Sequence, residues 1–516
     1  MKAYKMVSQN KNGKVHYVKE GTFVKDDIKK LHYYQFEVPK GTREIQFSFE
    51  LSPRVLKDPE KNRELIKGAL REYIEEYSED DKVKLFEWLR ERFFNTVYPI
   101  RNLLDISFYD SEGNYLGKLN QAFPRSGKFA LLNEKRASLG LTPRKIKPGT
   151  WIVEIAVASI VTDKCHYKME IFLCRKESEL PNKVKGKIVV SSTTEKKKKE
   201  IKEKGYWYAG ELHVHSNHSD GKNTINEIIQ GAKKEGLDFF ALTDHDVVSG
   251  YDFIPQNGTF LIIKGIEITT FYGHALALGV KSIINWRHNG KIRNINDIIN
   301  EVHAQGALFA IAHPFHIGDP VCAGCKWKFK ETDYRLVDMM EVWRNSWKLG
   351  KIENYRSFKL WDKLLNEGLR ITGISSRDWH NVEERKNGHI PKTFVHADSL
   401  SEDGILEGLR MGHVFVSSGP LLFFSAKHKD KRYECGDEIK LIEKEPINFQ
   451  IQIKNLKKPS RLQIIKNGLK FFDISLAEGK DQRVILSDLP EKSSWYRCEI
   501  YTEKDKELLC FANPIS

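Results

Sequence analysis

The 516-residue chain has few cysteines and no long apolar run, and each shortage excludes a class of protein. No uncharged stretch reaches the ~18–20 apolar residues that a membrane-spanning helix needs. Seven cysteines, an odd number spread along the chain, do not form the framework of a small disulfide-stabilised domain. The N-terminal MKAYKMVSQNKNGK lacks the apolar core of a secretory signal. We therefore expect a cytoplasmic protein without a membrane segment.

Charge and histidine are distributed unevenly along the chain. The formal net charge is +14, from 84 Lys and Arg against 70 Asp and Glu, which by itself would suit a nucleic-acid-binding protein. Residues 205–420, however, contain 24 Lys and Arg against 26 Asp and Glu, so the positive surplus lies in the flanks. The same segment contains 13 of the 17 histidines. A neutral to acidic region rich in histidine is more typical of a metal site than of a groove for a polyanion.

The two flanks of the chain have the pattern of β-structure. Residues 1–190 alternate apolar and polar side chains, which predicts a β-rich N-terminal domain. Helical spacing over about 57–94 interrupts this alternation and predicts an inserted helical hairpin. The charged segment 191–204 predicts a linker, with a basic patch for nucleic acid or phospholipid as the alternative. Residues 421–516 return to strands and predict a C-terminal β-sandwich.

Residues 205–420 alternate short strands with helices. The helices are expected over Asn223–Glu235, Ile295–Gln305, Arg356–Glu367 and Ser401–Arg410. Seven or so short strands separated by helices predict an α/β barrel. In such barrels the chemistry lies at the carboxyl ends of the strands, so residues that are distant in sequence meet at one mouth.

Histidines and carboxylates follow the ends of the predicted strands. Spacing of i and i+2 places the first two histidines on one face of their strand. The nine candidates are His213, His215, Asp220, His245, Glu267, His274, His313, Asp378 and His380. A lone histidine is more often a hydrogen-bonded core residue than a ligand. Burying six imidazoles and three carboxylates together without cations would leave uncompensated charge, so the set predicts a metal site.

The motifs that contain these residues resemble those of a known family. HVHSNHSDG, ALTDHD, GIE, GHALALG, AHP and a final Asp-x-His occur in the order typical of the PHP (polymerase and histidinol phosphatase) superfamily. The CehA/McbA-type branch is the most similar, and the closing CFANPIS is similar to that branch as well. The resemblance covers about residues 205–420 and does not extend to residues 1–190. It implies an α/β fold, a PHP-type distorted (β/α)7 barrel flanked by N-terminal and C-terminal β-sandwich-like domains.

The resemblance also implies two or three divalent metal ions, which would be Zn, Mn or Fe. Carried over motif by motif, it assigns His213, His215, Glu267 and Asp378 to the first ion, Asp220, His245 and His380 to the second, and His274 and His313 to the third. Glu267 would bridge the first and third ions. Chemistry independently favours a carboxylate there, because only a carboxylate has two oxygens to share, and mixed nitrogen and oxygen ligands suit these metals.

One residue departs from the family pattern. The family ends with Ser-Asp-x-His, whereas this chain has Ser376-Arg377-Asp378-Trp379-His380. Arg377 would either clamp phosphate, because guanidinium binds it in a bidentate way, or pair structurally with a carboxylate. Both interpretations stay open at this point.

Further candidates lie close to the motifs. His218 and His316 are candidate catalytic residues, as a general acid or a substrate contact, with ordinary polar loop residues as the alternative. Asp244 and Asp246 are expected to accept hydrogen bonds from His245 or from a neighbouring ligand.

A lone Cys-x2-Cys, Cys322 to Cys325, could indicate zinc or redox chemistry. Without a second pair it is interpreted as ordinary loop thiols.

The function expected from this set is that of a metal-dependent hydrolase. A phosphoesterase is favoured, acting on a small phosphate ester or a short oligonucleotide through a metal-bridging hydroxide. The alternative is hydrolysis of an ester, amide or carbamate at the same metals, as the CehA-type branch implies. A non-catalytic binding protein is the second alternative. The flanking β-domains would bind glycan, protein or another subunit.

Overall fold

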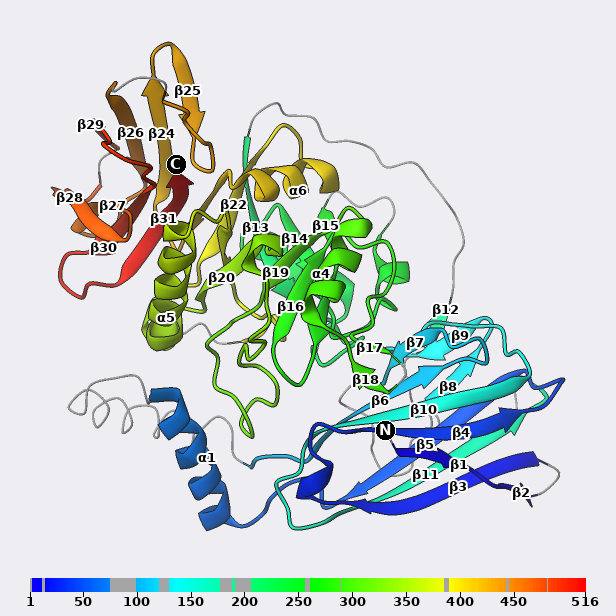
Figure 1. Cartoon of the computed structure of the whole chain (residues 1–516). Coiled ribbons are helices and arrows are strands. Elements are labelled where there is room, and N and C mark those ends of the chain that lie inside the picture. The colour runs from blue at the N-terminus through cyan, green and yellow to red at the C-terminus, as the bar shows by residue number, and fades with distance from the viewer. Residues whose placement is uncertain are drawn as a thin grey trace.

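The computed structural model describes residues 2–11, 14–74, 99–119, 130–176, 188–190, 206–255, 260–288, 290–384, 389–441, 445–479 and 481–516. Figure 1 shows an N-terminal pair of sheets in blue and cyan, a central green sheet with helices, and C-terminal strands in orange and red. The expected linker 191–204 and the second half of the expected helical hairpin lie outside the described residues. The domain boundaries given above stay predictions.

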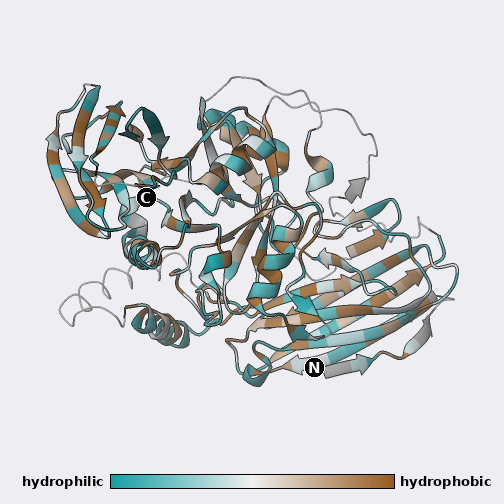
Figure 2. Ribbon diagram, turned by 45° about the horizontal axis from the view of Figure 1, so that its top comes forward, coloured by the Kyte–Doolittle hydropathy of each residue, from teal (hydrophilic) through white to brown (hydrophobic). Residues whose placement is uncertain are grey.

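Two sheets form the N-terminal part, called the N-terminal sandwich below. One has the order β1 (Lys2–Lys5), β4 (Leu31–Val38), β10 (Gly149–Ser159), β6 (Leu103–Tyr109), β7 (Tyr115–Lys118). The other has the order β12 (Ile188–Val190), β9 (Arg136–Ser138), β8 (Ala130–Asn133), β5 (Glu44–Ser52), β11 (Cys165–Cys174), β3 (Lys14–Phe23), β2 (Ser8–Lys11). Apolar residues recur along these strands, as the brown segments of the ribbon show (Figure 2). Their side chains meet in one core, with Val153 from the first sheet and Phe47 and Ile171 from the second.

A helix leaves this sandwich and packs elsewhere. α1 (Pro59–Ile74) buries Ile66 and Leu70 in a cluster that includes Ile317 and Ile352 of the central part. The described half of the expected hairpin therefore contacts the central part of the molecule.

The central sheet has parallel strands on both sides of one antiparallel strand. Its order is β21 (Thr372–Ser376), β20 (Met339–Arg344), β19 (Leu308–Ile311), β16 (His274–Leu278), β15 (Leu261–Thr269), β14 (Phe239–Leu242), β13 (Tyr206–Val214), β22 (Lys392–Ala397), β23 (Val414–Ser417). β13, β14 and β15 are mutually parallel, as are β19, β20 and β21, while β16 is antiparallel to both its neighbours. A small ribbon, β17 (Arg287–His288) with β18 (Lys291–Ile292), lies outside this sheet.

β13 and β21, which would have to pair to close a barrel, approach each other without forming a ladder of hydrogen bonds. β13 and β21 are not neighbours in the described sheet, and they meet through an isolated parallel bridge between Val214 and Trp379. The Trp379 backbone N–H donates to His213 O at 2.9 Å, and its carbonyl accepts from His215 N at 2.9 Å. The mixed α/β class is thus observed, whereas a closed (β/α)7 barrel is not confirmed.

The helices begin and end close to the expected residues, with one exception. They are α3 (Ile225–Lys234), α4 (Ile295–Ala304), α5 (Trp347–Asn366) and α6 (Glu402–Met411). Thr224 caps α3 through a capping box with Glu227, which fixes its first turn. α5 begins nine residues earlier than expected. Gly350 lowers the helical propensity there, but a Cβ at this position would lie 2.4 Å from Arg344 O, so glycine permits the close approach.

The C-terminal strands continue the central sheet. β31 (Leu508–Ile515) pairs with β23, and β30 (Tyr496–Thr502), β27 (Ser460–Lys466) and β28 (Leu469–Leu476) follow it. A second sheet has the order β25 (Lys431–Glu434), β24 (Leu421–His428), β26 (Ile447–Lys454), β29 (Gln482–Asp488) and covers it. Phe424, Phe449 and Ile464 share the core between these sheets, called the C-terminal sandwich below.

Short η turns complete the elements: η1 (Lys25–Asp27), η2 (Tyr251–Phe253) and η3 (Tyr334–Leu336).

Candidate metal centre

Four donor atoms, from His213, His215, Glu267 and Asp378, lie close together at the ends of three strands, β13, β15 and β21. His213 Nε2 lies 3.2 Å from Glu267 Oε2 and 3.4 Å from Asp378 Oδ1. His215 Nε2 lies 3.3 Å and 3.2 Å from the same two oxygens. A tetrahedral ion with bonds of about 2.0–2.1 Å would have ligand-to-ligand edges of about 3.3–3.4 Å. The four separations therefore fit one divalent ion.

A second group lies on the other side of His215. Asp220 Oδ1 is 3.5 Å from His245 Nε2 and 3.1 Å from His380 Nε2. His215 Nδ1 is 3.8 Å from the same oxygen. One donor atom from each of these four residues lies within 4.8 Å of the others, which is close enough to hold an ion.

Glu267 faces a third group with its other oxygen. Oε1 lies 3.0 Å from His274 Nδ1 and 3.3 Å from His313 Nε2, while Oε2 faces His213, His215 and, at 2.8 Å, His245 Nδ1. Both oxygens of this fully buried carboxylate are thus directed at separate sets of imidazoles. That is the arrangement that a bridging ligand needs.

Several buried donor atoms have no hydrogen-bond partner among the described residues. They are His213 Nε2, both ring nitrogens of His215, Asp220 Oδ1, Glu267 Oε2, His274 Nε2 and His313 Nδ1. Orphaned polar atoms in a buried site are costly unless another group satisfies them. The nine predicted residues therefore fit divalent cations, through their donor types, their separations and their unmet bonding capacity.

Charges in the cluster are strongly coupled. Burial raises the pKa of Glu267, but the His245 and His213 imidazoles outweigh it and hold that pKa well below its usual range. For His215, burial and the neighbouring His380 and His245 lower the pKa to about 4. Glu267 is thus ionised and His215 is neutral near pH 7, and these are the forms that bind metals.

Backbone strain is concentrated in the same place. His313 and Asp378 have φ of 28° and 52°, and Asp246, next to His245, has φ of 50°. Residues with a side chain rarely adopt this region, and they persist there only where the surroundings determine the conformation.

Two neighbouring residues orient the donors, and neither was predicted from the sequence. Glu341, fully buried in β20, accepts from His213 Nδ1 at 2.7 Å and from the His313 backbone N–H at 2.7 Å. Arg344, at the end of the same strand, donates to Asp378 Oδ2 at 2.8 Å. A carboxylate in the apolar run MMEVW, and a cation at a strand end, are signals that could have revealed them.

The two aspartates beside His245 have other partners than that histidine. Asp244 accepts from Ser216 and Ser219 hydroxyls at 2.6 Å each, so it holds the loop that follows β13. Asp246 Oδ1 accepts from the Thr269 backbone N–H at 2.9 Å. His245 Nδ1 lies 2.6 Å from Thr269 Oγ1 and 2.8 Å from Glu267 Oε2 instead.

His218 and His316 both lie near the cluster, yet neither lines the cavity described below. His218 is buried, its Nδ1 lies 2.9 Å from Ser249 Oγ, and burial lowers its pKa. His316 Nδ1 is 3.0 Å from Glu353 Oε1 and 3.3 Å from an Arg344 nitrogen. A catalytic role for these histidines stays a prediction.

Arg377 points away from the donors. Its guanidinium forms a 2.9 Å ion pair with Glu235, stacks on the Trp379 ring at 4.3 Å and is nearly buried. It is not among the described residues that line the cavity. Of the two interpretations left open by the sequence, the observed contact is the pairing with a carboxylate.

A cavity of about 370 Å³ opens on the donors, and two parts of the chain form its walls. The central part contributes ligands together with Phe271, Val321, Ala323 and both cysteines of the Cys-x2-Cys. Cys322 and Cys325 are joined as a disulfide, which corrects the expectation of ordinary thiols; the short loop brings their Cα atoms within 5.5 Å. The rest of the lining comes from the N-terminal sandwich and from residues 99–101, which precede its strand β6; the sequence did not connect this part with the site.

Buried ion pairs join the N-terminal sandwich to the loop that carries His245. The Lys118 ammonium of β7 donates to Asp246 Oδ2 at 3.0 Å and to Asp105 Oδ2 at 3.3 Å. Arg287 lies 3.0 Å from Glu154 Oε1 of β10 and 3.6 Å from Asp246. All of these side chains are nearly or fully buried, so the pairs are shielded from solvent.

The comparisons with known proteins concern mainly the central part. Residues 211–307 match a family model described as the PHP domain. Phosphoribosyl 1,2-cyclic phosphate 1,2-diphosphodiesterase from Eggerthella lenta is 32% identical over 80 residues, which cover 14% of this chain and 30% of the relative. The chain thus spans under a third of that relative's length.

Two solved structures were also found to be similar. One is a two-domain protein from Bacteroides vulgatus that contains a predicted PHP-like metal-dependent phosphoesterase. It is 16% identical in sequence, the match covers 62% of this chain and 100% of that chain, and the TM-score is 0.36. The other is an amidohydrolase from Chromobacterium violaceum with bound sulfate, 16% identical, with 35% and 90% covered, at a TM-score of 0.23.

Within the described residues, none of the helices combines the length and the apolar character needed to span a bilayer. The CehA/McbA-type branch stays a prediction. The segment 211–307 contains six of the nine predicted ligands, and its match supports placing the chain in the PHP superfamily.

Proposed function

We propose that the chain is a metal-dependent phosphoesterase that hydrolyses a compact phosphate ester. The observation that carries this proposal is Glu267, whose two oxygens face separate groups of imidazoles. In this proposal His213, His215, Glu267 and Asp378 hold one divalent ion, Asp220, His245 and His380 a second, and His274 and His313 a third that shares Glu267.

Bound divalent cations would lower the pKa of a coordinated water and neutralise charge on phosphoryl oxygens. The chain's own residues hold the donors in place. Glu341 fixes the tautomer of His213 by accepting from Nδ1, which leaves Nε2 directed at the cluster. Arg344 occupies Asp378 Oδ2 and leaves Oδ1 directed at the two histidines.

The size of the cavity favours the smaller of the two substrate classes expected from the sequence. A volume of about 370 Å³ lies near the lower end of about 300–1,000 Å³ for small-molecule sites. It suits one compact ester better than several nucleotides. The name of the Eggerthella lenta relative describes a diphosphodiesterase of phosphoribosyl 1,2-cyclic phosphate, which supports testing cyclic diesters as well as monoesters.

A screen with metal analysis tests the proposal. Protein purified without chelator is assayed with an aryl phosphate, a cyclic phosphodiester and an aryl carbamate, before and after EDTA and after return of Mn or Zn. We expect two to three metal equivalents and metal-dependent hydrolysis of at least one phosphate ester. The variant His303→Asn serves as a control, because His303 bonds Asp338 outside the cluster. Hydrolysis of the carbamate alone, or hydrolysis that survives removal of all metal, would contradict the proposal.

A further inference from the structure

The part of the cavity wall that comes from the N-terminal part of the chain is mostly apolar and contains one arginine. Pro99, Ile100, Arg101, Leu103, Asp105, Ala158 and Ser159 contribute to it. Most of these residues are apolar, so this end of the cavity is suited to an organic group and not to a second phosphoryl-transfer centre. The same cavity is lined by seven of the proposed metal ligands, so a substrate that binds the metals in this cavity would also be close to this wall.

Arg101 is the only lysine or arginine among the described residues that line this cavity. Its side chain is exposed. None of the described carboxylates lies within 4 Å of its guanidinium. The carboxylate on the same wall, Asp105, is paired with Lys118 at 3.3 Å. The other arginines near the centre are already engaged, Arg344 with Asp378 and Arg377 with Glu235. Arg101 therefore presents a positive charge to whatever occupies the cavity.

We propose that Arg101 forms a subsite for a second anionic group, so that the substrate is a compact phosphate ester carrying a carboxylate or a further phosphate on its leaving group. This inference rests on the function proposed above. The metal end would take the ester phosphate, the apolar residues Ile100 and Leu103 would contact the carbon framework, and Arg101 would bind the distal anion. Guanidinium suits both candidate anions because its paired donors match carboxylate and phosphate oxygens.

Three matched esters test the subsite: phenyl phosphate without a second charge, 4-carboxyphenyl phosphate, and 1,4-phenylene bisphosphate. They share the same ring and the same bond to be broken, so differences in kcat/KM report on the distal group. The variants are Arg101→Ala and Arg101→Lys. The control is Arg43→Ala, which removes an exposed arginine of the same sandwich that does not line the cavity. Thermal unfolding of each variant is measured first, to show that it is folded.

We expect the unchanged protein to prefer one or both doubly charged esters. Arg101→Ala should raise their KM about 10-fold and change phenyl phosphate less than about 3-fold, because a charge-assisted contact is lost only with the distal anion. Arg101→Lys should recover part of the loss, and Arg43→Ala should change nothing. The preferred ester distinguishes a carboxylate from a phosphate as the distal group.

Other results would overturn the subsite. If all three esters are hydrolysed with equal efficiency, or if Arg101→Ala affects them equally, Arg101 does not bind a distal anion, while the proposed function stands. If the metal-loaded protein hydrolyses none of the three esters and no other phosphate ester, the proposed function fails and the subsite fails with it.

Discussion

The central sheet has two junctions with the rest of the chain, and they are built differently. At the N-terminal junction, buried ion pairs such as Lys118 with Asp246 reach the loop of a proposed metal ligand. A close approach there also favours glycine: Gly140 of the N-terminal part has φ of +90°, and a Cβ on it would lie 3.1 Å from His218 O of the central part. The same sandwich supplies a wall of the cavity.

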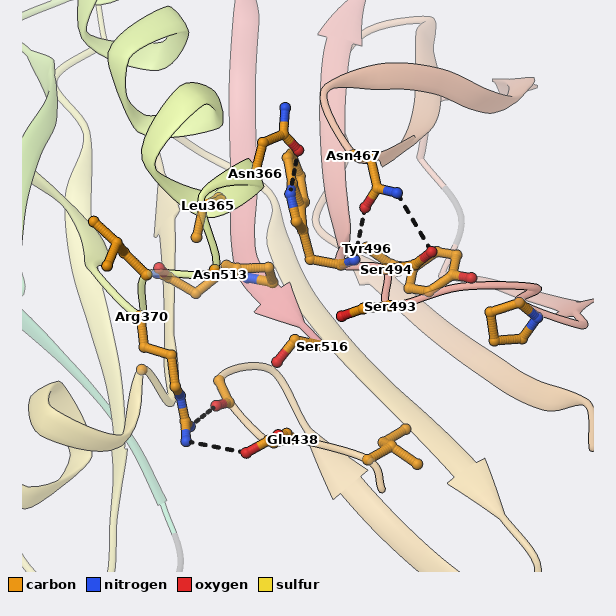
Figure 3. Close-up of a pocket in the computed structure, with 18 of the residues that line it drawn as sticks. Leu365, Asn366, Arg370, Glu438, Asn467, Ser493, Ser494, Tyr496, Asn513 and Ser516 are labelled. Atoms are coloured by element: carbon orange, nitrogen blue, oxygen red, sulfur yellow. Dashed lines mark hydrogen bonds and ion pairs between the residues drawn. The ribbon is translucent and has the colours of Figure 1, made fainter. Parts of the chain in front are cut away.

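At the C-terminal junction the contacts are sheet pairing, aromatic packing and the ion pair of Arg497 with Asp362, and neither of these two residues is a proposed metal ligand or adjacent to one. β31 pairs with β23, and Phe511 contacts the rings of Trp343, Phe358 and Trp361. A cavity of about 1210 Å³ lies there (Figure 3), where Arg370 pairs with Glu438 and Asn467 bonds Ser494. No cluster of metal donors was found in it among the described residues, and none of the described residues lining the cavity of the metal centre comes from the C-terminal sandwich.

The difference between the junctions teaches that the size of a cavity does not locate the chemistry. The larger cavity has no group of donors among its described lining residues, whereas seven of the nine predicted ligands line the smaller one. The N-terminal junction should therefore influence catalysis, and the C-terminal junction should influence stability alone.

The largest loss of metal and of kcat/KM is expected from Glu267→Gln, which tests whether a metal centre lies beside the N-terminal junction. The amide keeps the shape but loses the charge and one oxygen donor, so we expect loss of metal from both groups that it faces and a fall in kcat/KM of about 100-fold or more. Elemental analysis and kinetics measure this. His274→Asn, which removes a donor to one group, should lose less metal. Full occupancy and rate in Glu267→Gln would show that the bridge assignment is wrong.

The next effect is expected from Lys118→Met. Asp105 would lose its cation and Asp246 would keep only Arg287, and breaking a buried pair in this way costs about 3–5 kcal/mol of unfolding free energy. Because Asp246 also holds Thr269, whose hydroxyl contacts His245, kcat/KM should fall as well.

Urea denaturation and kinetics with the metal-loaded protein separate the two effects of Lys118→Met. The double variant with Asp246→Asn should recover part of the stability. If kcat/KM of the folded fraction stays unchanged, the N-terminal junction is no more than a structural contact.

Arg497→Met is the matched change at the other junction. Arg497 is buried, pairs with Asp362 and Glu499, and stacks on Trp361 at 4.7 Å. Its removal should lower the unfolding free energy by about 3 kcal/mol, for the same reason as at Lys118. We expect kcat/KM and metal content to stay within about 2-fold, and a larger change in either would remove the distinction between the junctions.

The smallest effect is expected from Arg377→Lys. The lysine keeps the charge opposite Glu235 but loses the planar stacking on Trp379, so we expect a loss of about 1 kcal/mol in unfolding free energy. Hydrolysis of charged and neutral substrates should change equally, by less than about 3-fold. A selective loss on phosphate esters of 10-fold or more would restore the phosphate-clamp interpretation.

The sequence predicted the donor set because one topological rule governs it. Carboxyl ends of neighbouring strands meet at one edge, so motifs such as HVHS and ALTDHD converge whatever the intervening segments do. The structure brings all nine residues together, and their assignment to particular ions stays a prediction. Closure of the sheet into a barrel depends on the twist of the whole sheet, which local sequence patterns do not encode. The barrel was therefore less predictable than the grouping of the donors at the strand ends.

The contacts that support the donors were less visible in the sequence. Lys118 is the last residue of β7, whose sequence YLGK is typical of a solvent-facing edge strand. Its partner Asp246 lies 128 positions away in the sequence. Glu341 and Glu154 did carry a signal, because a carboxylate within an apolar strand needs a partner. That signal indicates that a partner exists but does not say which residue it is.

The place of β31 in the sheet has a consequence for biosynthesis. β23 is made well before β31, the strand that covers its free edge. While the ribosome makes the intervening segment, the apolar Val414, Phe415 and Val416 lie on an unpaired edge, which is a template for pairing with other nascent chains. Slowing translation after residue 417 should therefore lower the soluble yield, and supplying chaperones that bind exposed strands should raise it.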